Sequence, residues 1–227
     1  LMDLATGYLS TAWDKAVQAN NQTYGKSSLE ALKVEIDEIT KTMVDLANTE
    51  YNDNYIFGGT NTKILPYEQA ENGDIIYNGT PYDNKDYIRQ TEVADGVFEV
   101  INTTGDKVFG YYKSAVEPGN GVYTDANGKR VIESTDAGTG QKVYKYENGV
   151  EYTGDVADLT DGAEEEAVGV MGALRKLSNS LGTVVEGLEA GDDAMVQEGY
   201  AEMNSTLDMF SDSLNTITTE QTKFGGV

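Results

Sequence analysis

Apolar residues recur every three or four positions along both ends of the chain. This period predicts two amphipathic helices near the N-terminus, over residues 1–20 and 28–48. It predicts two more near the C-terminus, one ending before Gly191 and a long one from Asp193 to Phe224, about 48 Å in length. The heptad-spaced stripe of the long helix comprises Val196, Tyr200, Met203, Leu207, Phe210, Leu214, Ile217, Gln221 and Phe224. Each stripe needs a partner, so we expect both chain ends to close one elongated antiparallel bundle.

Polar residues indicate how the helices begin. Ser27 or Ser28 can cap the second helix, with Glu30 completing a capping box for Ser27. Asp192 or Asp193 can cap the long helix. The apolar stripes of the first and last helices each require a partner, so we expect these two helices to pair in antiparallel fashion. Leu1 and Phe224 should then lie at the same end of the molecule, far from the β insertion.

The helical period disappears between residues 52 and 162, and a β pattern replaces it. Short runs of β-branched and aromatic residues alternate with dipeptides that favour type I′ hairpin turns. These dipeptides are Asn72-Gly73, Asn78-Gly79, Asp95-Gly96, Asn127-Gly128 and Asn148-Gly149. We therefore predict an α+β protein, with residues 1–53 and 163–227 forming a discontinuous helical domain and residues 54–162 an inserted antiparallel β domain. Few contacts should cross these boundaries, so excising residues 61–161 should leave a soluble bundle.

Five glycines interrupt the third and fourth helices: Gly169, Gly172, Gly182, Gly187 and Gly199. Each costs about 1 kcal/mol relative to alanine in a helix interior, and none lies on an apolar stripe. We therefore expect alanine at positions 182 and 187 to raise the melting temperature.

The composition excludes several kinds of chemistry. The chain has 227 residues with no cysteine and no histidine. Disulfides, thiol catalysis, a Ser-His-Asp triad and an H-E-x-x-H zinc site are thereby ruled out. Acidic residues outnumber basic ones 39 to 16, giving a net charge of −23. Such a charge disfavours binding to nucleic acids and to anionic membranes.

The remaining candidate sites have simpler explanations. Gly58-Gly59 lacks the Lys-Ser/Thr pair of a phosphate-binding loop, so we interpret it as a tight turn. The acidic run over residues 155–166 lacks EF-hand spacing and is typical of a solvated linker. The lone Trp13 is expected in core or interface packing. We predict no enzymatic activity, no cofactor and no metal site.

Three blocks of sequence resemble the bacterial flagellar hook–filament junction proteins, the hook-associated protein 3 family. The first is AVQANN at residues 16–21, followed by a helix ending in Leu46-Ala47-Asn48-Thr49. The second and most specific is Tyr55-Ile56-Phe57-Gly58-Gly59-Thr60 with Pro66-Tyr67. Tyr77-Asn78-Gly79 and Gly105-Asp106-Lys107-Val108-Phe109 continue it. The third block is the helix end Lys223-Phe224-Gly225-Gly226-Val227. Residues 111–166 resemble a family-variable insertion, and a single proline at position 66 departs from the family's Pro-Pro pair.

The resemblance implies a structural adaptor that sits between hook-associated protein 1 and flagellin and forms a ring of its own copies. It implies a location in the extracellular flagellum and export by the flagellar type III apparatus without a cleaved signal peptide. We interpret the chain as a core fragment that lacks both terminal segments and is monomeric in solution. The residues expected to fix how the β part leaves the bundle are Leu46, Asn48, Tyr55, Phe57, Gly58, Gly59 and Pro66. Tyr77, Gly79, Gly105 and Phe109 complete the motif, and Asn48 and Asn54 are expected to bond the departing backbone.

Two other functions remain open from the sequence. The helical blocks are shared with flagellin, so a filament subunit is the first alternative. A secreted carbohydrate-binding or carbohydrate-active protein is the second, supported only by tyrosine-rich strands and abundant carboxylates.

Overall fold

The computed structural model describes residues 1–80, 90–100, 103–136, 138–147 and 149–225. Asn148 of one predicted turn and the terminal Gly226-Val227 lie outside the described residues. Contacts group the chain into two compact units: unit 1 comprises Leu1–Tyr112 with Ala167–Val227, and unit 2 comprises Lys113–Glu166. The division of the chain at residues 54 and 162 stays a prediction.

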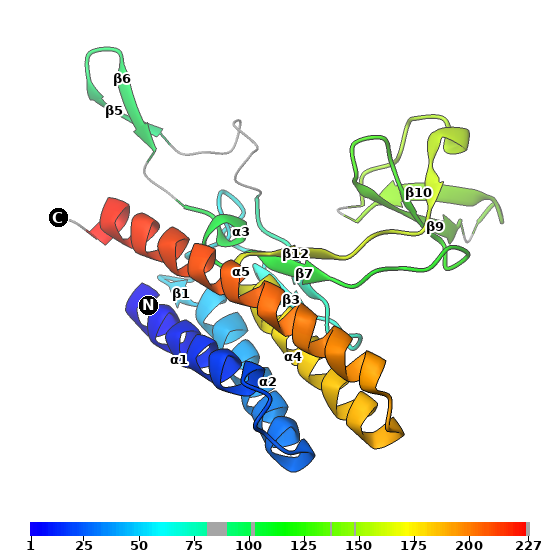
Figure 1. Ribbon diagram of the computed structural model, residues 1–227. Helices are drawn as coiled ribbons and strands as arrows, with labels where there is room; N and C mark the ends of the chain where they lie inside the picture. The colour runs from blue at the N-terminus through cyan, green and yellow to red at the C-terminus, as the bar shows by residue number, and fades with distance from the viewer. Residues whose placement is uncertain (81–89, 101–102, 137, 148, 226–227) are drawn as a thin grey trace. The chain divides into compact units, whose positions relative to one another are not determined.

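The four predicted helices are confirmed, with small shifts at their ends (Figure 1). They are α1 (Met2–Asn20), α2 (Lys26–Ala47), α4 (Gly169–Ala190) and α5 (Asp193–Gly225). The apolar faces of all four contribute to one core, which holds Leu9, Ile36, Leu177 and Phe210 among others. The predicted α+β class, with helices at both ends of the chain, is thus confirmed. Within the described residues, no helix has the length and hydropathy needed to cross a membrane.

The first and last helices pair in antiparallel fashion, as expected. The Asn20 amide donates to Asn204 Oδ1 at 3.1 Å. At the other end of the pair, the Gln221 amide donates to the Asp3 carboxylate. The expectation that this end lies far from the β insertion is wrong, because Lys107 forms an ion pair with Glu220 there at 2.7 Å.

Two helix starts differ in how they are capped. The predicted capping box of α2 is wrong: the helix begins earlier, after an extended Gly25, and makes no side-chain cap. Asp192 caps α5 as predicted, since its Oδ1 accepts the amides of Ala194 and Met195 at 3.0 and 3.1 Å. Gly191 ends α4 in the left-handed conformation, which glycine adopts without strain.

The buried face of α5 differs from the predicted stripe at three positions, which are spaced seven residues apart. Leu207, Leu214 and Gln221 are only half-buried. The positions one residue earlier, Thr206, Ser213 and Glu220, are buried instead. The buried face of α5 therefore combines a row of apolar residues with a row of small or polar ones, and α5 contacts α1, α3 and α4.

Unit 1 also contains strands that contribute to the helical core. Its main sheet has the order β12-β7-β4-β3. The strands are β3 (Tyr67–Gln69), β4 (Ile75–Tyr77), β7 (Tyr111–Lys113) and β12 (Glu166–Val168). Tyr67, Ile75 and Tyr112 belong to the same buried cluster as the helices. The remaining elements of this region are β1 (Glu50–Tyr51), β2 (Asn54–Tyr55), β5 (Gln90–Ala94), β6 (Val97–Val100) and the short helix α3 (Gly105–Val108).

Unit 2 is a small antiparallel sheet with the order β10-β9-β8-β11. Its elements are β8 (Val122–Thr124), β9 (Arg130–Thr135), β10 (Lys142–Tyr146), β11 (Thr160–Asp161) and the 3-10 turn η2 (Val156–Asp158). Among its described residues, Val131 is the one apolar side chain that is fully buried. Tyrosine pairs supplement this small core: Tyr123 with Tyr144, and Tyr146 with Tyr152, at ring separations of 5.8 and 5.9 Å.

The predicted type I′ turns are wrong at the described Asn-Gly and Asp-Gly sites. In Asn72-Gly73, Asp95-Gly96 and Asn127-Gly128 only the glycine has a positive φ. At Asn72-Gly73 and Asn127-Gly128 five residues separate the paired strand ends, as in longer hairpin loops that contain one left-handed residue, whereas two residues separate Ala94 from Val97. Asn52-Asp53 instead has φ values of 49° and 58° and links β1 to β2 as a two-residue hairpin.

Gly182 and Gly199 differ in how closely other residues approach them, so alanine at each position tests the packing of α4 and α5. A methyl group at Gly182 would meet only Lys33 Cε at 3.6 Å, so Gly182→Ala should raise the free energy of unfolding by about 1 kcal/mol. At Gly199 it would lie 2.6 Å from Val184 Cγ2 and 2.9 Å from the Ser180 carbonyl, so Gly199→Ala should lower it by about 1–3 kcal/mol. Urea unfolding monitored by helical circular dichroism measures both.

Gly187 is closely packed, as Gly199 is, and lacks the free space found beside Gly182. Its methyl would lie 2.8 Å from the Val196 amide nitrogen, so the expected gain from alanine there is wrong. Equal effects of alanine at positions 182 and 199 would contradict this account of the α4–α5 contact.

Candidate functional site

Asn48, which directly follows α2, is hydrogen-bonded to the first residue of strand β3. The Asn48 amide donates to the Tyr67 carbonyl at 2.9 Å, and Asn48 Oδ1 accepts the Tyr67 amide at 2.8 Å. Asn54 bonds the Asn52 carbonyl at 2.7 Å and accepts from the Thr62 hydroxyl. Both asparagines thus bond nearby groups as expected, and Asn48 fixes the start of β3 to the end of α2.

The glycine pair after Phe57 forms a tight turn, as predicted. Gly59 has φ of +69°, and a side chain there would lie 2.9 Å from Thr80 Cβ. A side chain at Gly58 would lie 2.7 Å from the Asn61 carbonyl oxygen. The Gly58 carbonyl accepts amides from Asn61 and Thr80, so the turn is bonded on both sides.

Four aromatic side chains meet where α2, the sheet and α3 come together; we call them the aromatic junction. They are Phe57, Tyr67, Tyr77 and Phe109. The Phe57 and Phe109 rings are 4.9 Å apart in a T-shaped contact. Tyr67 is 5.1 Å from Tyr77 and 6.3 Å from Phe109 between ring centroids. Edge-to-face pairs of this kind add to the stabilisation from burial.

The two tyrosine hydroxyls of the aromatic junction bond backbone groups from distant segments. Tyr77 donates to the Phe57 carbonyl at 2.8 Å and accepts the Gly105 amide at 3.2 Å. Tyr67 donates to the Gly110 carbonyl at 2.9 Å. Burial raises the pKa of both hydroxyls well above the usual value for tyrosine. Both therefore stay neutral donors at physiological pH.

Close approach explains two glycines of the motif. A methyl group at Gly105 would lie 2.7 Å from ring atoms of both Tyr67 and Tyr77. One at Gly79 would lie 2.2 Å from the Tyr77 hydroxyl. The aromatic junction therefore occupies the space that a side chain would need at either position.

The structure brings most of the predicted motif residues together. Phe57, Tyr77, Gly105 and Phe109 lie within the aromatic junction or in contact with it. Gly58, Gly59, Gly79 and Pro66 lie in the turns around it, where the Pro66 carbonyl accepts the Asn78 amide at 2.7 Å. Leu46 is half-buried at the end of α2, and Tyr55 lies in the β1–β2 hairpin.

Sequence reasoning missed three residues. Tyr67 follows Pro66 in the quoted motif but was not among the candidates, although it is fully buried. Lys107 lies inside another quoted block. Glu220 is one position before the predicted stripe residue Gln221, and only the contact with α3 distinguishes the two. In the described ranges, no three acidic side chains gather as a metal site.

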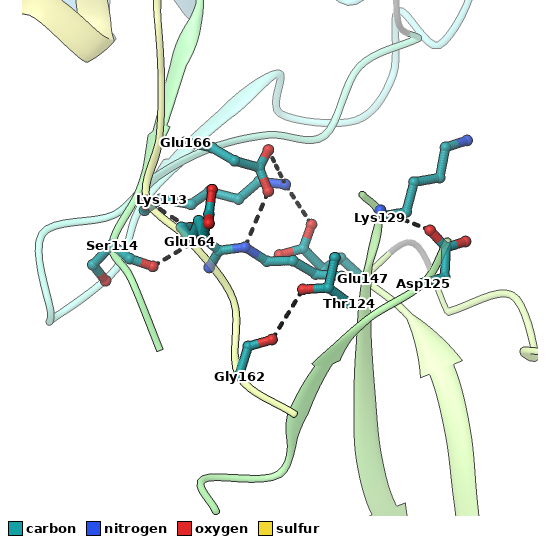
Figure 2. A network of polar contacts seen from close by, with 10 residues as sticks. Lys113, Ser114, Thr124, Asp125, Lys129, Glu147, Gly162, Glu164 and Glu166 are labelled. Atoms are coloured by element: carbon teal, nitrogen blue, oxygen red, sulfur yellow. Dashed lines mark hydrogen bonds and ion pairs between the residues drawn. The ribbon is translucent and has the colours of Figure 1, made fainter. Parts of the chain in front are cut away.

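A polar cluster within unit 2 centres on Arg130, whose side chain is 4% exposed. Figure 2 shows Lys113, Glu147 and Glu166 of this cluster. Its guanidinium bonds Glu166 Oε1 at 3.1 Å and the carbonyls of Ser114 and Glu164 at 2.9 and 2.7 Å. Lys113 adds ion pairs with Glu147 and Glu166. Arg130 thus joins the first residues of unit 2, at 113–114, to its last residues, at 164–166.

Unit 2 should lose stability in acid. Hydrogen bonds from the Lys129 amide lower the pKa of Asp125, and bonds from Lys142 and Tyr144 lower that of Glu133. A carboxyl whose pKa is depressed by folding stabilises the fold above its unfolded pKa, and that contribution fades as pH falls through the folded value. We therefore expect unit 2 to be less stable at pH 3 than at pH 7. Tyrosine near-ultraviolet circular dichroism during urea titration measures this.

Glu133→Gln should reduce the difference in the stability of unit 2 between pH 3 and pH 7. Glu151→Gln, which replaces an exposed carboxylate of the same unit, should leave that difference unchanged. A pH dependence unaltered by Glu133→Gln would contradict the assignment.

Comparison with known proteins gives relatives of one kind. No family model matches the chain. A curated relative, flagellar hook-associated protein 3 of Salmonella typhimurium, is 30% identical over 119 residues. That match covers 52% of this chain and 35% of the relative, so the comparison spans about a third of the length of the Salmonella protein.

Solved structures match over nearly all of the chain. Flagellar hook-associated protein 3 from Legionella pneumophila has a TM-score of 0.60 at 17% identity, covering 99% of this chain and 81% of that one. FlgL from Xanthomonas campestris has a TM-score of 0.58 at 17% identity, covering 99% and 84%. At this identity the likeness shows the fold, which is that of the flagellar hook-associated proteins. Together with the Salmonella relative, it confirms the predicted resemblance to the hook-associated protein 3 family.

Proposed function

We propose that the chain is the structural core of an adaptor in the bacterial flagellum, joining the hook, through hook-associated protein 1, to the flagellin filament. The observation that carries this proposal is the match over 99% of the chain to structures of hook-associated protein 3 and FlgL. The aromatic junction supports it, because its polar groups are used to connect segments of the chain to one another.

In this proposal the protein acts through the surfaces that contact its partners, and the aromatic junction fixes the elements that carry those surfaces. It holds the end of α2, the sheet and α3 together. Copies of the complete protein form a ring in the assembled flagellum, reach it by type III export, and act without catalysis. The isolated chain is a monomer, since its net charge of −23 opposes association.

Reconstitution tests the proposal. The complete protein should add to hook-associated protein 1 and then accept flagellin, and it should not polymerise on its own. Self-polymerisation into long filaments would favour the flagellin alternative. Addition of flagellin directly to hook-associated protein 1, unchanged when this protein is left out, would reject the adaptor role. Specific binding on a glycan array, together with failed reconstitution, would favour the carbohydrate-binding alternative.

A further inference from the structure

The C-terminal part of α5 extends past the start of its partner helix. Gly199 of α5 lies against Ser180 and Val184 of α4. In an antiparallel pair this register places Gly169, where α4 begins, opposite residues near position 212. Residues 214–225, which we call the arm, therefore continue beyond α4. The arm contacts α1 and α3 instead.

A cleft lies at the point where the arm begins. It has a volume of about 310 Å³ and lies between α3, the start of α4 and α5. Residues that line it include Val108, Val168, Gly169, Met209 and Ser213. The cleft is open to solvent, so this face of α5 is not fully covered by other residues at this position.

The same stretch of α5 carries side chains that promote bending. The Ser213 hydroxyl donates to the Met209 carbonyl at 2.6 Å, and the Thr216 hydroxyl donates to the Asp212 carbonyl at 2.9 Å. Thr218 and Thr222 make the same bond to carbonyls four residues earlier. Such bonds compete with the helix ladder and often bend helices. Residues 209–216 thus combine a cause of bending with room for it.

Past the cleft, a buried ion pair holds the arm. Lys107 Nζ lies 2.7 Å from Glu220 Oε1, with side-chain exposures of 26% and 4%. Within the described residues, Glu220 Oε2 has no hydrogen-bond partner. A buried carboxylate that is only partly satisfied is weak evidence for a stabilising role, and such pairs are best attested as devices that select one conformation.

We propose that residues 209–216 are a hinge and that the Lys107–Glu220 pair is the latch that holds the arm against α3. With the latch intact, one orientation of the arm is occupied. When it is broken, the uncompensated carboxylate leaves the interior, and the arm, now held by its contacts with α1 alone, pivots about the hinge. This inference rests on contacts within unit 1 and does not depend on the proposed function.

Distance measurement between spin labels tests the latch. The chain has no cysteine, so Glu186→Cys on α4 and Thr222→Cys on the arm give two exposed labelling sites. The parent protein should give one narrow distance distribution. Lys107→Met should broaden or shift it and lower the melting temperature by about 10 °C. Replacing the exposed pair on α2, with Lys41→Met and Glu38→Gln, should change neither.

Two further variants keep the test decisive if Lys107→Met unfolds the arm. Lys107→Met with Glu220→Leu removes the buried charge, and should recover most of the melting temperature while the distribution stays broad. Adding Ser213→Ala and Thr216→Ala to that pair should narrow the distribution, because the bending bonds are gone. A distribution as narrow as the parent's in the Lys107→Met/Glu220→Leu protein would overturn the latch. A broad distribution unaffected by the two alanines would overturn the hinge.

Discussion

Phe109→Ala should lower the free energy of unfolding by about 3–5 kcal/mol, the usual cost of removing a fully buried phenylalanine. The side chain is 1% exposed and contacts both Phe57 and Tyr67 in the aromatic junction. For a chain of this size the melting temperature should fall by about 6–20 °C. Thermal unfolding monitored by circular dichroism at 222 nm measures the change.

The matched control is Tyr51→Ala, since that aromatic side chain is 71% exposed. It should change the free energy of unfolding by less than about 0.5 kcal/mol. Phe109→Leu should lie between the two, because it keeps part of the buried volume. If Phe109→Ala and Tyr51→Ala had similar effects, the aromatic junction would not be a central part of the core.

Removing unit 2 should leave a folded protein, whereas removing the larger predicted insertion should not. In the first deletion, a short Gly-Ser link replaces residues 114–165. Lys113 and Glu166 lie on neighbouring strands, with Nζ and Oε2 3.5 Å apart, so a short link can close the chain. We expect helical circular dichroism and cooperative unfolding to persist.

The second deletion, of residues 61–161, was expected from the sequence to leave a soluble bundle. The structure reverses that expectation, because the deletion also removes Tyr67, Ile75, Phe109 and Tyr112, each at most 2% exposed. Loss of each such side chain costs about 2–5 kcal/mol, so their combined contribution is comparable with the whole stability of a typical domain. The expected results are lost cooperativity and aggregation. A cooperative melt of this second protein would show that the helices form a core without the sheet.

The helices could be predicted because their signal is local. The three- and four-residue period of α2, α4 and α5 depends only on which side chains are apolar, and its bounds agree closely with the structure. The turn types could not be predicted in the same way. Asn72-Gly73 and Asn52-Asp53 differ in loop length, and loop length depends on strand register across the hairpin.

The candidate site was predicted in part, and the reason is physical. Phe57, Gly105 and Phe109 stood in recognisable motifs, but no sequence pattern places them against one another. The role of Glu220 depends on a lysine more than a hundred residues earlier in the chain. A helical period cannot distinguish it from Gln221, which is why the predicted stripe was displaced by one residue at this position and not along its whole length.

The pairing of α1 with α5 has a consequence for the order in which the protein folds. Asp3 and Asn20 find their partners at positions 221 and 204, so α1 depends on a helix that is synthesised much later. At 5–20 residues per second, α1 must wait roughly 10–40 s for that partner. Its buried side consists mainly of alanines, which supply little hydrophobic driving force to hold it elsewhere in the meantime. Docking of α1 is therefore a late step in folding, and a chain released before α5 is complete would keep α1 undocked.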